Sequence, residues 1–159
     1  RAFLPALESG GFALAGKLMT TGHDGDRLKT ATNEFYHRSV SDHALRHWES
    51  SETPVMFCPG DYGASSPVLD LLVDTALQAG ALGACLTGAG IAGTVLALCQ
   101  REKTAAIMET LRQKMASEEY ARLAGLSSPL TTDQLQQAVL INHAPAGTGE
   151  LCFPSCPPF

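Results

Sequence analysis

The middle of the chain contains the glycine-rich segment Gly83-Ala84-Cys85-Leu86-Thr87-Gly88-Ala89-Gly90-Ile91-Ala92-Gly93-Thr94. Short apolar segments lie on either side of its glycines, at residues 81–86 and 94–99. A turn this rich in glycine is unfavourable inside a helix, because each glycine gives up more backbone entropy than any other residue. The pattern therefore predicts a strand, a glycine-rich turn and a second strand.

The turn also has the composition of an anion site. Glycines accept positive φ angles and carry no Cβ, so several backbone N–H groups can approach an anion from one side. A tight turn without any ligand explains the same glycines. The spacing fits neither G-x-G-x-x-G followed by a helix nor G-x-x-x-x-G-K-[ST], because a strand is expected after the turn. Spacing alone leaves both interpretations open.

Residues 66–80, just before this stretch, carry the clearest helix signal in the chain. Ser66 is the expected N-cap, Pro67 suits the first helical position, and Gly80 ends the helix. The apolar residues between them recur at helical spacing and form one core-facing stripe, made of Leu69, Leu72, Val73, Ala76 and Leu77.

Weaker patterns predict the remaining elements. A helix is expected at residues 4–19 with a break at Gly10-Gly11, and its buried face is Leu4, Leu7, Phe12, Ala15, Leu18 and Met19. Further elements are a short helix at residues 41–48, a helix at 101–120 and a strand at 138–141. In the 101–120 helix the expected buried residues are Ala105, Met108, Leu111 and Met115. Thr131 with Gln136 forms a predicted capping box.

The order of these elements indicates the fold class. Helices alternate with short strands but lack the regular cadence of a parallel sheet. We expect an α+β fold in which helices pack on one face of a largely antiparallel sheet.

Composition sets further limits. The 159 residues suit one compact domain, and a net charge of −5 is the wrong sign for a protein whose main partner is nucleic acid. Residues 81–99 are interrupted by glycine and threonine and fall short of a membrane helix, so no membrane span is expected. Five cysteines without a C-x-x-C pair argue against a disulfide scaffold or zinc ribbon. A cytoplasmic location is the expectation.

Other residues that could carry chemistry are also explained by structural roles. His43 and His47 share one helix face, with His37 and Cys58 nearby in sequence, but no metal motif frames them, so solvated histidines and no metal site are expected. The turn-like sequence Gly22-His23-Asp24-Gly25-Asp26 is interpreted as structural. Asp70 is expected on a helix surface or a domain interface. Free thiols are expected at Cys152 and Cys156.

Four blocks of the chain resemble the GHMP sugar and small-metabolite kinases, and most closely their galactokinase branch. Their third signature, approximately G-A-[RK]-[ML]-T-G-x-G-x-G-G, is similar to Gly83, Ala84, Leu86, Thr87, Gly88, Gly90 and Gly93 in register. Residues 62–73 resemble the family's preceding helix start, Y-x-x-S-x-P-E-L-D-x-L-V. Residues 12–27 resemble F-G-x-L-M-x-x-S-H-x-S-L-R, and residues 139–151 resemble the last strand and P-A-x-G-A turn. The four blocks follow the family's order.

The resemblance has departures. Cys85 stands where the family has Arg or Lys, Ala92 where it has Gly, Thr94 where it often has Cys, and Val68 where it has Glu. A cation that touched phosphate at position 85 would contribute about 1.5 to 3 kcal/mol, so its replacement bears on activity.

The resemblance implies a domain organisation. Residues 1–151 form a ferredoxin-like GHMP kinase C-terminal domain, with a family-atypical insertion at residues 28–61 and a Pro/Cys-rich tail at 152–159. The first residue is not Met, which indicates a piece of a longer protein. The family's sugar signature, main phosphate loop and catalytic Asp and Arg belong to an N-terminal kinase domain, so no catalytic residue is expected in this chain.

The resemblance also implies a function. The loop Thr87, Gly88, Ala89, Gly90, Ile91, Ala92 and Gly93 would close on the sugar and phosphate side of a cleft, opposite the N-terminal kinase domain. The whole protein would transfer the γ-phosphoryl group of ATP to the anomeric hydroxyl of galactose or a related sugar. ATP and Mg²⁺ would be bound mainly by the N-terminal domain. In this interpretation Gly90→Val lowers turnover by blocking the approach of the backbone to the ligand.

Two alternatives stay open at this point. The first is a GHMP kinase for another sugar, such as a uronic acid, an N-acetylhexosamine or a heptose, and the N-terminal half decides which. A kinase-derived sugar or ATP sensor that no longer turns over is consistent with Cys85 and Ala92.

Overall fold

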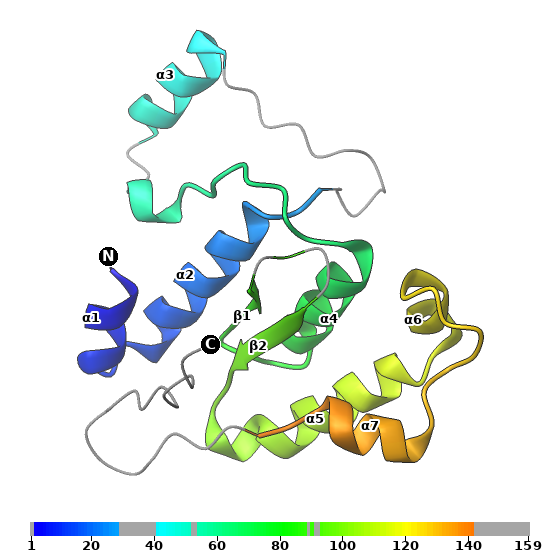
Figure 1. Ribbon diagram of the computed structural model, residues 1–159. Helices are drawn as coiled ribbons and strands as arrows, with labels where there is room; N and C mark the ends of the chain where they lie inside the picture. Colours follow the sequence, from blue (N-terminus) through cyan, green and yellow to red (C-terminus); the bar gives the residue numbers. More distant parts are fainter. Residues whose placement is uncertain (1, 29–40, 52–53, 89, 91–92, 142–159) are drawn as a thin grey trace, which may run out of the picture.

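The computed structural model describes residues 2–28, 41–51, 54–88, 90 and 93–141. An antiparallel pair of strands lies among helices (Figure 1). The chain order is α1 (Phe3–Glu8), α2 (Phe12–Asp24), α3 (Asp42–Ser50), the 3-10 turn η1 (Val55–Phe57), α4 (Pro67–Gln78), β1 (Gly83–Thr87), β2 (Thr94–Leu98), the 3-10 turn η2 (Arg101–Lys103), α5 (Thr104–Met115), α6 (Glu118–Leu123) and α7 (Thr132–Ala138). The α+β class is confirmed.

The two strands form the predicted hairpin. β1 and β2 are antiparallel, and the register pairs Gly83 with Leu98 at the open end and Thr87 with Thr94 next to the glycine turn. Because side chains alternate along a strand, Ala84 and Ala97 point to one face and Cys85 and Leu96 to the other. The two faces therefore have different surroundings.

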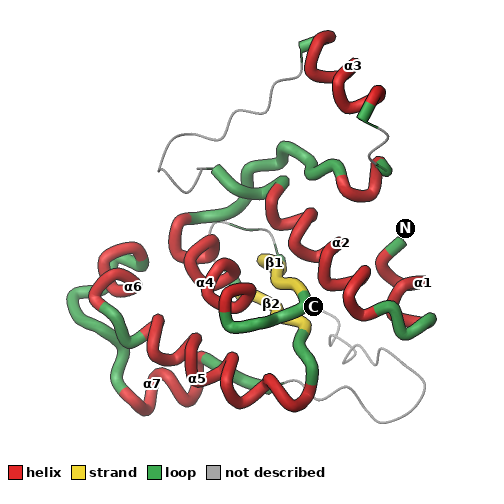
Figure 2. The backbone as a smooth tube through the Cα atoms, turned by 180° about the vertical axis from the view of Figure 1, so that it is seen from behind, coloured by secondary structure: helices red, strands yellow, loops and turns green. Residues whose placement is uncertain are grey.

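Helix α4 covers the face that carries Ala84. Val73 and Ala76 of α4 are fully buried against Ala84, and Leu77, Ala81, Val95, Ala97 and Leu111 pack around this centre. Helix α5 lies beside α4, and both views show these helices on one side of the hairpin (Figures 1 and 2). The predicted apolar stripe of α4 accordingly forms the core.

Helix α2 runs alongside β1 in backbone contact. A Cβ added to Gly16 would overlap the carbonyl group of Leu82, and one added to Gly83 would overlap the carbonyl group of Gly16. Only glycine permits this approach of a helix to a strand. The N–H group of Ala84 donates to Thr20 Oγ1 at 3.3 Å, so side chains of α2 satisfy amides of β1 that do not face β2.

The segment that precedes α4 returns to the end of α2. The N–H group of Ser65 donates to the carbonyl oxygen of Asp26 at 2.8 Å, and that of Tyr62 donates to Gly25 at 2.9 Å. A Cβ on Gly25 would meet the backbone nitrogen of Gly60 at 2.7 Å. This packing fixes the start of α4 against the last turn of α2.

The first predicted helix is two helices. Gly10 adopts φ of +73° between α1 and α2, which confirms the predicted break. Ala15 is fully buried, but Leu4 and Phe12 are 53% and 51% exposed, so the predicted buried face was wrong at these two positions. The reason is that the chain changes direction at the break, so the apolar residues of α1 and α2 do not form one continuous face against the same packing partner.

The predicted helix at 101–120 also divides. Helix α5 ends at Met115, and Ser117 caps α6 by accepting a hydrogen bond from the Tyr120 N–H at 3.2 Å. In α5, Ala105 is exposed, so the predicted buried face was wrong at this position, and Ile107, which was not predicted, is buried; Met108 is half-buried and Leu111 packs on the core. Met115 is buried as predicted.

The predicted strand at residues 138–141 was wrong. The capping box at Thr131 begins α7, which continues through Ala138, and Val139 to Ile141 have no regular structure. The capping partner is Gln134 rather than the predicted Gln136, because the side chain that reaches back to the N-cap belongs to the third helical residue. The predicted tail at 152–159 and the turn near Pro145 lie outside the described residues.

Candidate functional site

The glycine turn lies at the end of the hairpin where Thr87 pairs with Thr94. Thr87, Gly88, Gly90 and Gly93 belong to the described residues, whereas Ala89, Ile91 and Ala92 lie outside them. Thr87, Gly88 and Gly93 are exposed to solvent, and Gly90 is buried. Part of the predicted site therefore faces outward and part faces the protein.

Gly88 and Gly90 both need the conformational freedom of glycine. Gly88 has φ of +90° and Gly90 has φ of +82°, in the region that L side chains rarely adopt. Their surroundings differ. A Cβ on Gly88 would meet no atom of the described residues within 4 Å, whereas a Cβ on Gly90 would overlap the carbonyl oxygen of Ala64.

This difference changes the role expected for Gly90. Its missing side chain lets the loop pack on Ala64, so a clash of Gly90→Val arises inside the protein itself. Gly88 is the position where the backbone of the described loop is open to an approaching ligand.

A cleft of about 330 Å³ lies next to the loop, between the start of α4 and α6. Ser66, the N-cap of α4, contributes a hydroxyl that is buried without a hydrogen-bond partner and makes no capping bond. Burial raises the pKa of Tyr120 above its ordinary value, so this phenol stays protonated at neutral pH. The cleft is lined by Ser66, Val68, Leu69, Leu72, Gly93, Tyr120, Leu123 and Ala124. Sequence reasoning did not single out Ser66 or Tyr120 for the site, because their meeting depends on how α6 folds back on α4.

Cys85 is a half-buried thiol two residues before the loop. Burial raises its pKa, and the negative charge of Asp26 raises it further. The neutral thiol is therefore the stable form, which argues against a nucleophilic role. The proximity of Asp26 also means that a cation at position 85 would have a carboxylate near it.

A polar network lies beneath the loop. His23 is fully buried in the last turn of α2, where its Nδ1 accepts a hydrogen bond from the Leu86 N–H at 3.3 Å. Its Nε2 lies 3.1 Å from Asp70 Oδ1, although the ring N–H does not point along a hydrogen bond to that oxygen. The structural interpretation of His23 holds, but His23 and Asp24 belong to a helix and not to a turn. Asp70 faces this network with a side chain that is 14% exposed, so it does not lie on an open helix surface; the domain-interface alternative stays a prediction.

Arg27 supplies the positive charge next to this network. Its guanidinium donates to both oxygens of Asp74, at 2.5 and 3.3 Å, and to Asp24 at 3.0 Å. Burial alone would lower the pKa of Arg27, but the hydrogen bonds to Asp74 and Asp24 outweigh it and raise the pKa above its ordinary value. Arg27 Nη1 lies 3.9 Å from Asp70 Oδ1, so the arginine also offsets the charge of that carboxylate.

The histidines considered for metal binding lie elsewhere. His43 and His47 are exposed on α3, as predicted, and His37 lies outside the described residues. Across the part of the chain that the structure describes, no three His, Cys, Asp or Glu side chains come together in a way that could hold a metal ion.

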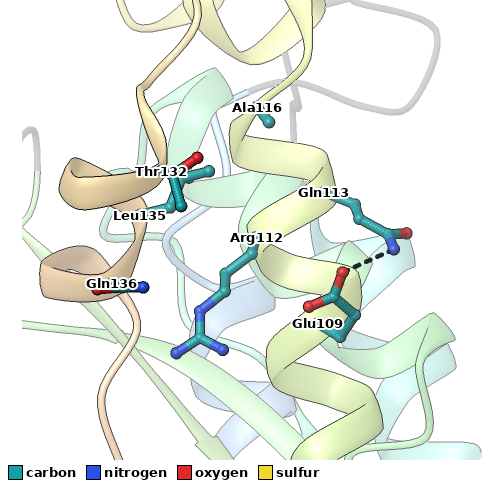
Figure 3. A pocket seen from close by; sticks show the side chains of 7 residues that line it. All are labelled: Glu109, Arg112, Gln113, Ala116, Thr132, Leu135 and Gln136. Carbon is teal, nitrogen blue, oxygen red and sulfur yellow. Dashed lines mark hydrogen bonds between the residues drawn. The ribbon is translucent and has the colours of Figure 1, made fainter.

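A second cleft, of about 570 Å³, separates α5 from α7 (Figure 3). Arg112 points between the two helices, and its Nη2 donates to the Val139 carbonyl at 3.4 Å. Gln113 donates to Glu109 at 2.9 Å on the same helix. The cleft is lined by Glu109, Arg112, Gln113, Ala116, Thr132, Leu135 and Gln136. None of these residues belongs to the predicted glycine-loop site.

The helices are short. The longest of those described has 13 residues, and no helix within the described ranges has the length and apolar character needed to cross a bilayer.

Comparison with known proteins identifies related sequences. Residues 28–117 match the family model described as "GHMP kinases C terminal". A galactokinase of Streptomyces coelicolor is 36% identical over 78 residues, which cover 49% of this chain and 19% of the relative. A galactokinase of Mycobacterium bovis is 25% identical over 150 residues, which cover 94% of this chain and 29% of the relative. A galactokinase of Mycobacterium tuberculosis is 25% identical over 118 residues, which cover 74% of this chain and 24% of the relative.

The matched lengths set the scope of the comparison. The chain spans less than a third of the length of the curated relatives it matches. The family match begins at Leu28, the first residue of the segment interpreted as an insertion, and includes the whole glycine loop.

Proposed function

Because the chain belongs to the GHMP kinase family, as its C-terminal domain, we propose that it is the C-terminal part of an ATP-dependent sugar kinase. The reaction would transfer the γ-phosphoryl group of ATP to the anomeric hydroxyl of galactose or a related sugar. The relatives named above support galactose as the first substrate to test, since each carries the name galactokinase.

The open backbone at Gly88 carries the proposal. Gly88 combines a φ of +90° with a Cβ position that no other part of the described chain approaches within 4 Å. An oxygen of phosphate or sugar can reach a backbone amide closely at such a position. Thr87, exposed beside it, would add a hydroxyl hydrogen bond. The proposed binding loop remains Thr87, Gly88, Ala89, Gly90, Ile91, Ala92 and Gly93.

The loop would act by positioning and by electrostatics. Phosphoryl transfer needs nucleotide, metal and hydroxyl in one geometry, and fixed dipoles stabilise the developing charge without reorganisation. Gly90 packs on Ala64, so its own backbone would be in place before the ligand arrives. This chain would thus contribute one wall of the cleft and no catalytic side chain.

ATP and Mg²⁺ fit this arrangement only in part. The exposed glycine backbone suits phosphate oxygens, whereas the described residues offer no carboxylate cluster for a cation. In our proposal an N-terminal kinase domain of the same polypeptide holds most of the nucleotide and the metal. Bound Mg²⁺ would neutralise charge on the phosphates. We propose a cytoplasmic setting for the whole enzyme.

The same loop is compatible with two other functions. A GHMP kinase for a uronic acid, an N-acetylhexosamine or a heptose would keep this domain and change the sugar-binding half. A sensor that binds sugar or ATP without turnover is favoured by one observation: Cys85 is a neutral thiol beside Asp26 where a cation is typical of the family.

Full-length protein separates these functions. It is assayed for ADP release with ATP, Mg²⁺ and a panel of galactose, galacturonic acid, N-acetylgalactosamine and a heptose, and for binding of each sugar by calorimetry. Galactose-dependent ADP release supports the proposal. ADP release with a different sugar and not with galactose supports a GHMP kinase for that sugar. Sugar binding without ADP release supports the sensor.

A further inference from the structure

A fully buried histidine is unusual beneath a loop that is itself partly exposed. His23 has 0% of its surface accessible, and both of its ring nitrogens face polar groups. A buried imidazole without partners would lose the hydration of two polar atoms, so its partners determine what it holds in place. Its Nδ1 accepts a hydrogen bond from the Leu86 N–H, whereas its Nε2 lies close to Asp70 Oδ1 without making a hydrogen bond.

Leu86 is the penultimate residue of β1, which leads into the glycine turn. Its N–H donates to His23 Nδ1 at 3.3 Å. Because Nδ1 accepts this bond, a neutral ring carries its proton on Nε2, which faces Asp70 Oδ1 at 3.1 Å. His23 therefore connects the strand end to a carboxylate of α4.

Asp70 continues the connection to the other side of the loop. Its Oδ1 accepts a hydrogen bond from Ser65 Oγ at 2.6 Å, and Ser65 is 1% exposed. The residue before Ser65 is Ala64, whose carbonyl oxygen is the surface on which Gly90 lies. The network thus reaches the backbone N–H of Leu86 on one side. On the other side it reaches Ser65, the residue after the Ala64 on which Gly90 lies.

We propose that His23 and Asp70 are positioning residues for the glycine loop. They hold the end of β1 and the Ala64 support in one fixed relation, so the backbone amides of Thr87 and Gly88 present a single geometry. Arg27 keeps the Asp70 carboxylate compatible with burial, since it lies 3.9 Å from Asp70 Oδ1 and is anchored on Asp74. The consequence for turnover rests on the function proposed above, whereas the consequence for loop geometry does not.

Three variants of the full-length protein test the proposal. His23→Leu removes both polar nitrogens at similar volume. His23→Asn keeps an acceptor near the position of Nδ1. Val73→Ala is the matched control, because Val73 is fully buried in α4 and belongs to the apolar core rather than to the network. Each variant is measured by hydrogen exchange of the amides of residues 86–93 and by steady-state kinetics.

We expect His23→Leu to speed exchange at residues 86–93 and to lower kcat by at least about tenfold, since small displacements of positioned groups cost that much. The KM for the sugar should change by less than about threefold, because a positioning residue away from the sugar mainly alters the transition state. His23→Asn should restore part of the exchange protection and of kcat. Val73→Ala should lower thermal stability while leaving loop exchange and kcat close to the parent values.

Other outcomes would overturn the proposal. Equal changes in loop exchange for His23→Leu and Val73→Ala would reduce His23 to a packing residue. If His23→Leu does not fold, His23→Asn is compared with His23→Gln, which carries its polar group toward Asp70. Stronger exchange protection of the loop amides in His23→Gln than in His23→Asn would contradict the assigned hydrogen bond to Leu86. If the parent protein releases no ADP with any sugar, the proposed function fails, and the exchange measurement still decides the positioning role.

Discussion

Gly90 lies against the carbonyl oxygen of Ala64 so closely that no Cβ can be added to it. Its φ of +82° places it in the left-handed region as well. Two residues earlier, Gly88 has a similar φ of +90°, and no atom of the described ranges comes within 4 Å of the place of its Cβ. One loop therefore contains a glycine required by the protein's own packing and a glycine whose open side is free for a ligand.

The two loop glycines should differ in their effect on stability. Gly88→Ala introduces only backbone strain, so we expect a loss of about 1 to 2 kcal/mol. Gly90→Ala adds the overlap with Ala64, so we expect it to lower the free energy of unfolding by more than about 3 kcal/mol. Urea unfolding of the two variants against the parent measures the difference. Equal losses would contradict the assigned contact between Gly90 and Ala64.

Two glycines of α2 should have opposite effects. Gly22→Ala should stabilise the protein by about 0.5 to 1 kcal/mol, because a Cβ there meets nothing within 4 Å and alanine favours the helix. Gly16→Ala should destabilise it by at least about 3 kcal/mol, because its Cβ would overlap the Leu82 backbone. The thermal midpoints of both variants test this pair. A Gly16→Ala midpoint equal to or above the parent would show that α2 does not contact β1 through its backbone.

The capping box of α7 offers a third test. Thr131 accepts a hydrogen bond from the Gln134 N–H at 3.4 Å, and the Gln134 side chain accepts from the Thr131 N–H at 2.9 Å. Thr131→Ala should cost about 1 kcal/mol. Its control is Thr132→Ala, an exposed substitution one residue later that leaves the cap intact. The urea unfolding midpoints of the two variants are compared with that of the parent. A larger loss of stability in Thr132→Ala than in Thr131→Ala would contradict the assigned cap.

Alkaline pH should destabilise the folded protein through Cys85. Its folded pKa is raised, chiefly by burial and then by Asp26, so the unfolded thiol ionises at a lower pH than the folded one. The free energy of unfolding is then unaffected by this group below the ordinary thiol pKa and falls as the pH rises from that value through the folded pKa. Cys85→Ser should flatten this part of the stability curve, measured by urea unfolding from pH 7 to pH 10. An unchanged slope in Cys85→Ser would assign the alkaline loss to other groups.

The sequence predicted those parts of the fold that local signals determine. The Ser66-Pro67 start of α4 and the glycine turn between β1 and β2 were found because the fixed φ of proline and the glycine content act within a few residues. The strand predicted at residues 138–141 failed, because a short apolar run is compatible with several structures and the preceding capping box favoured a helix.

The site was less predictable for a different reason. The contact of Gly16 with Gly83 and the approach of His23 to Asp70 join residues about fifty or more positions apart, and they depend on how α2 crosses β1 and α4. The burial of Gly90 on Ala64 is of the same kind. A glycine in a loop looks the same in the sequence whether it makes room for a ligand or for its own chain.

The central claim is that the open face of the loop meets the reacting phosphate or sugar in the whole enzyme. The direct test is kcat/KM for galactose-dependent ADP release by full-length Gly88→Ala, with Gly10→Ala as its control. Gly10 also has a positive φ, of +73°, and no atom within 4 Å of an added Cβ, but it lies between α1 and α2. We predict a decrease of at least about tenfold for Gly88→Ala and less than about twofold for Gly10→Ala. Equal kcat/KM values for the two variants would contradict the claim.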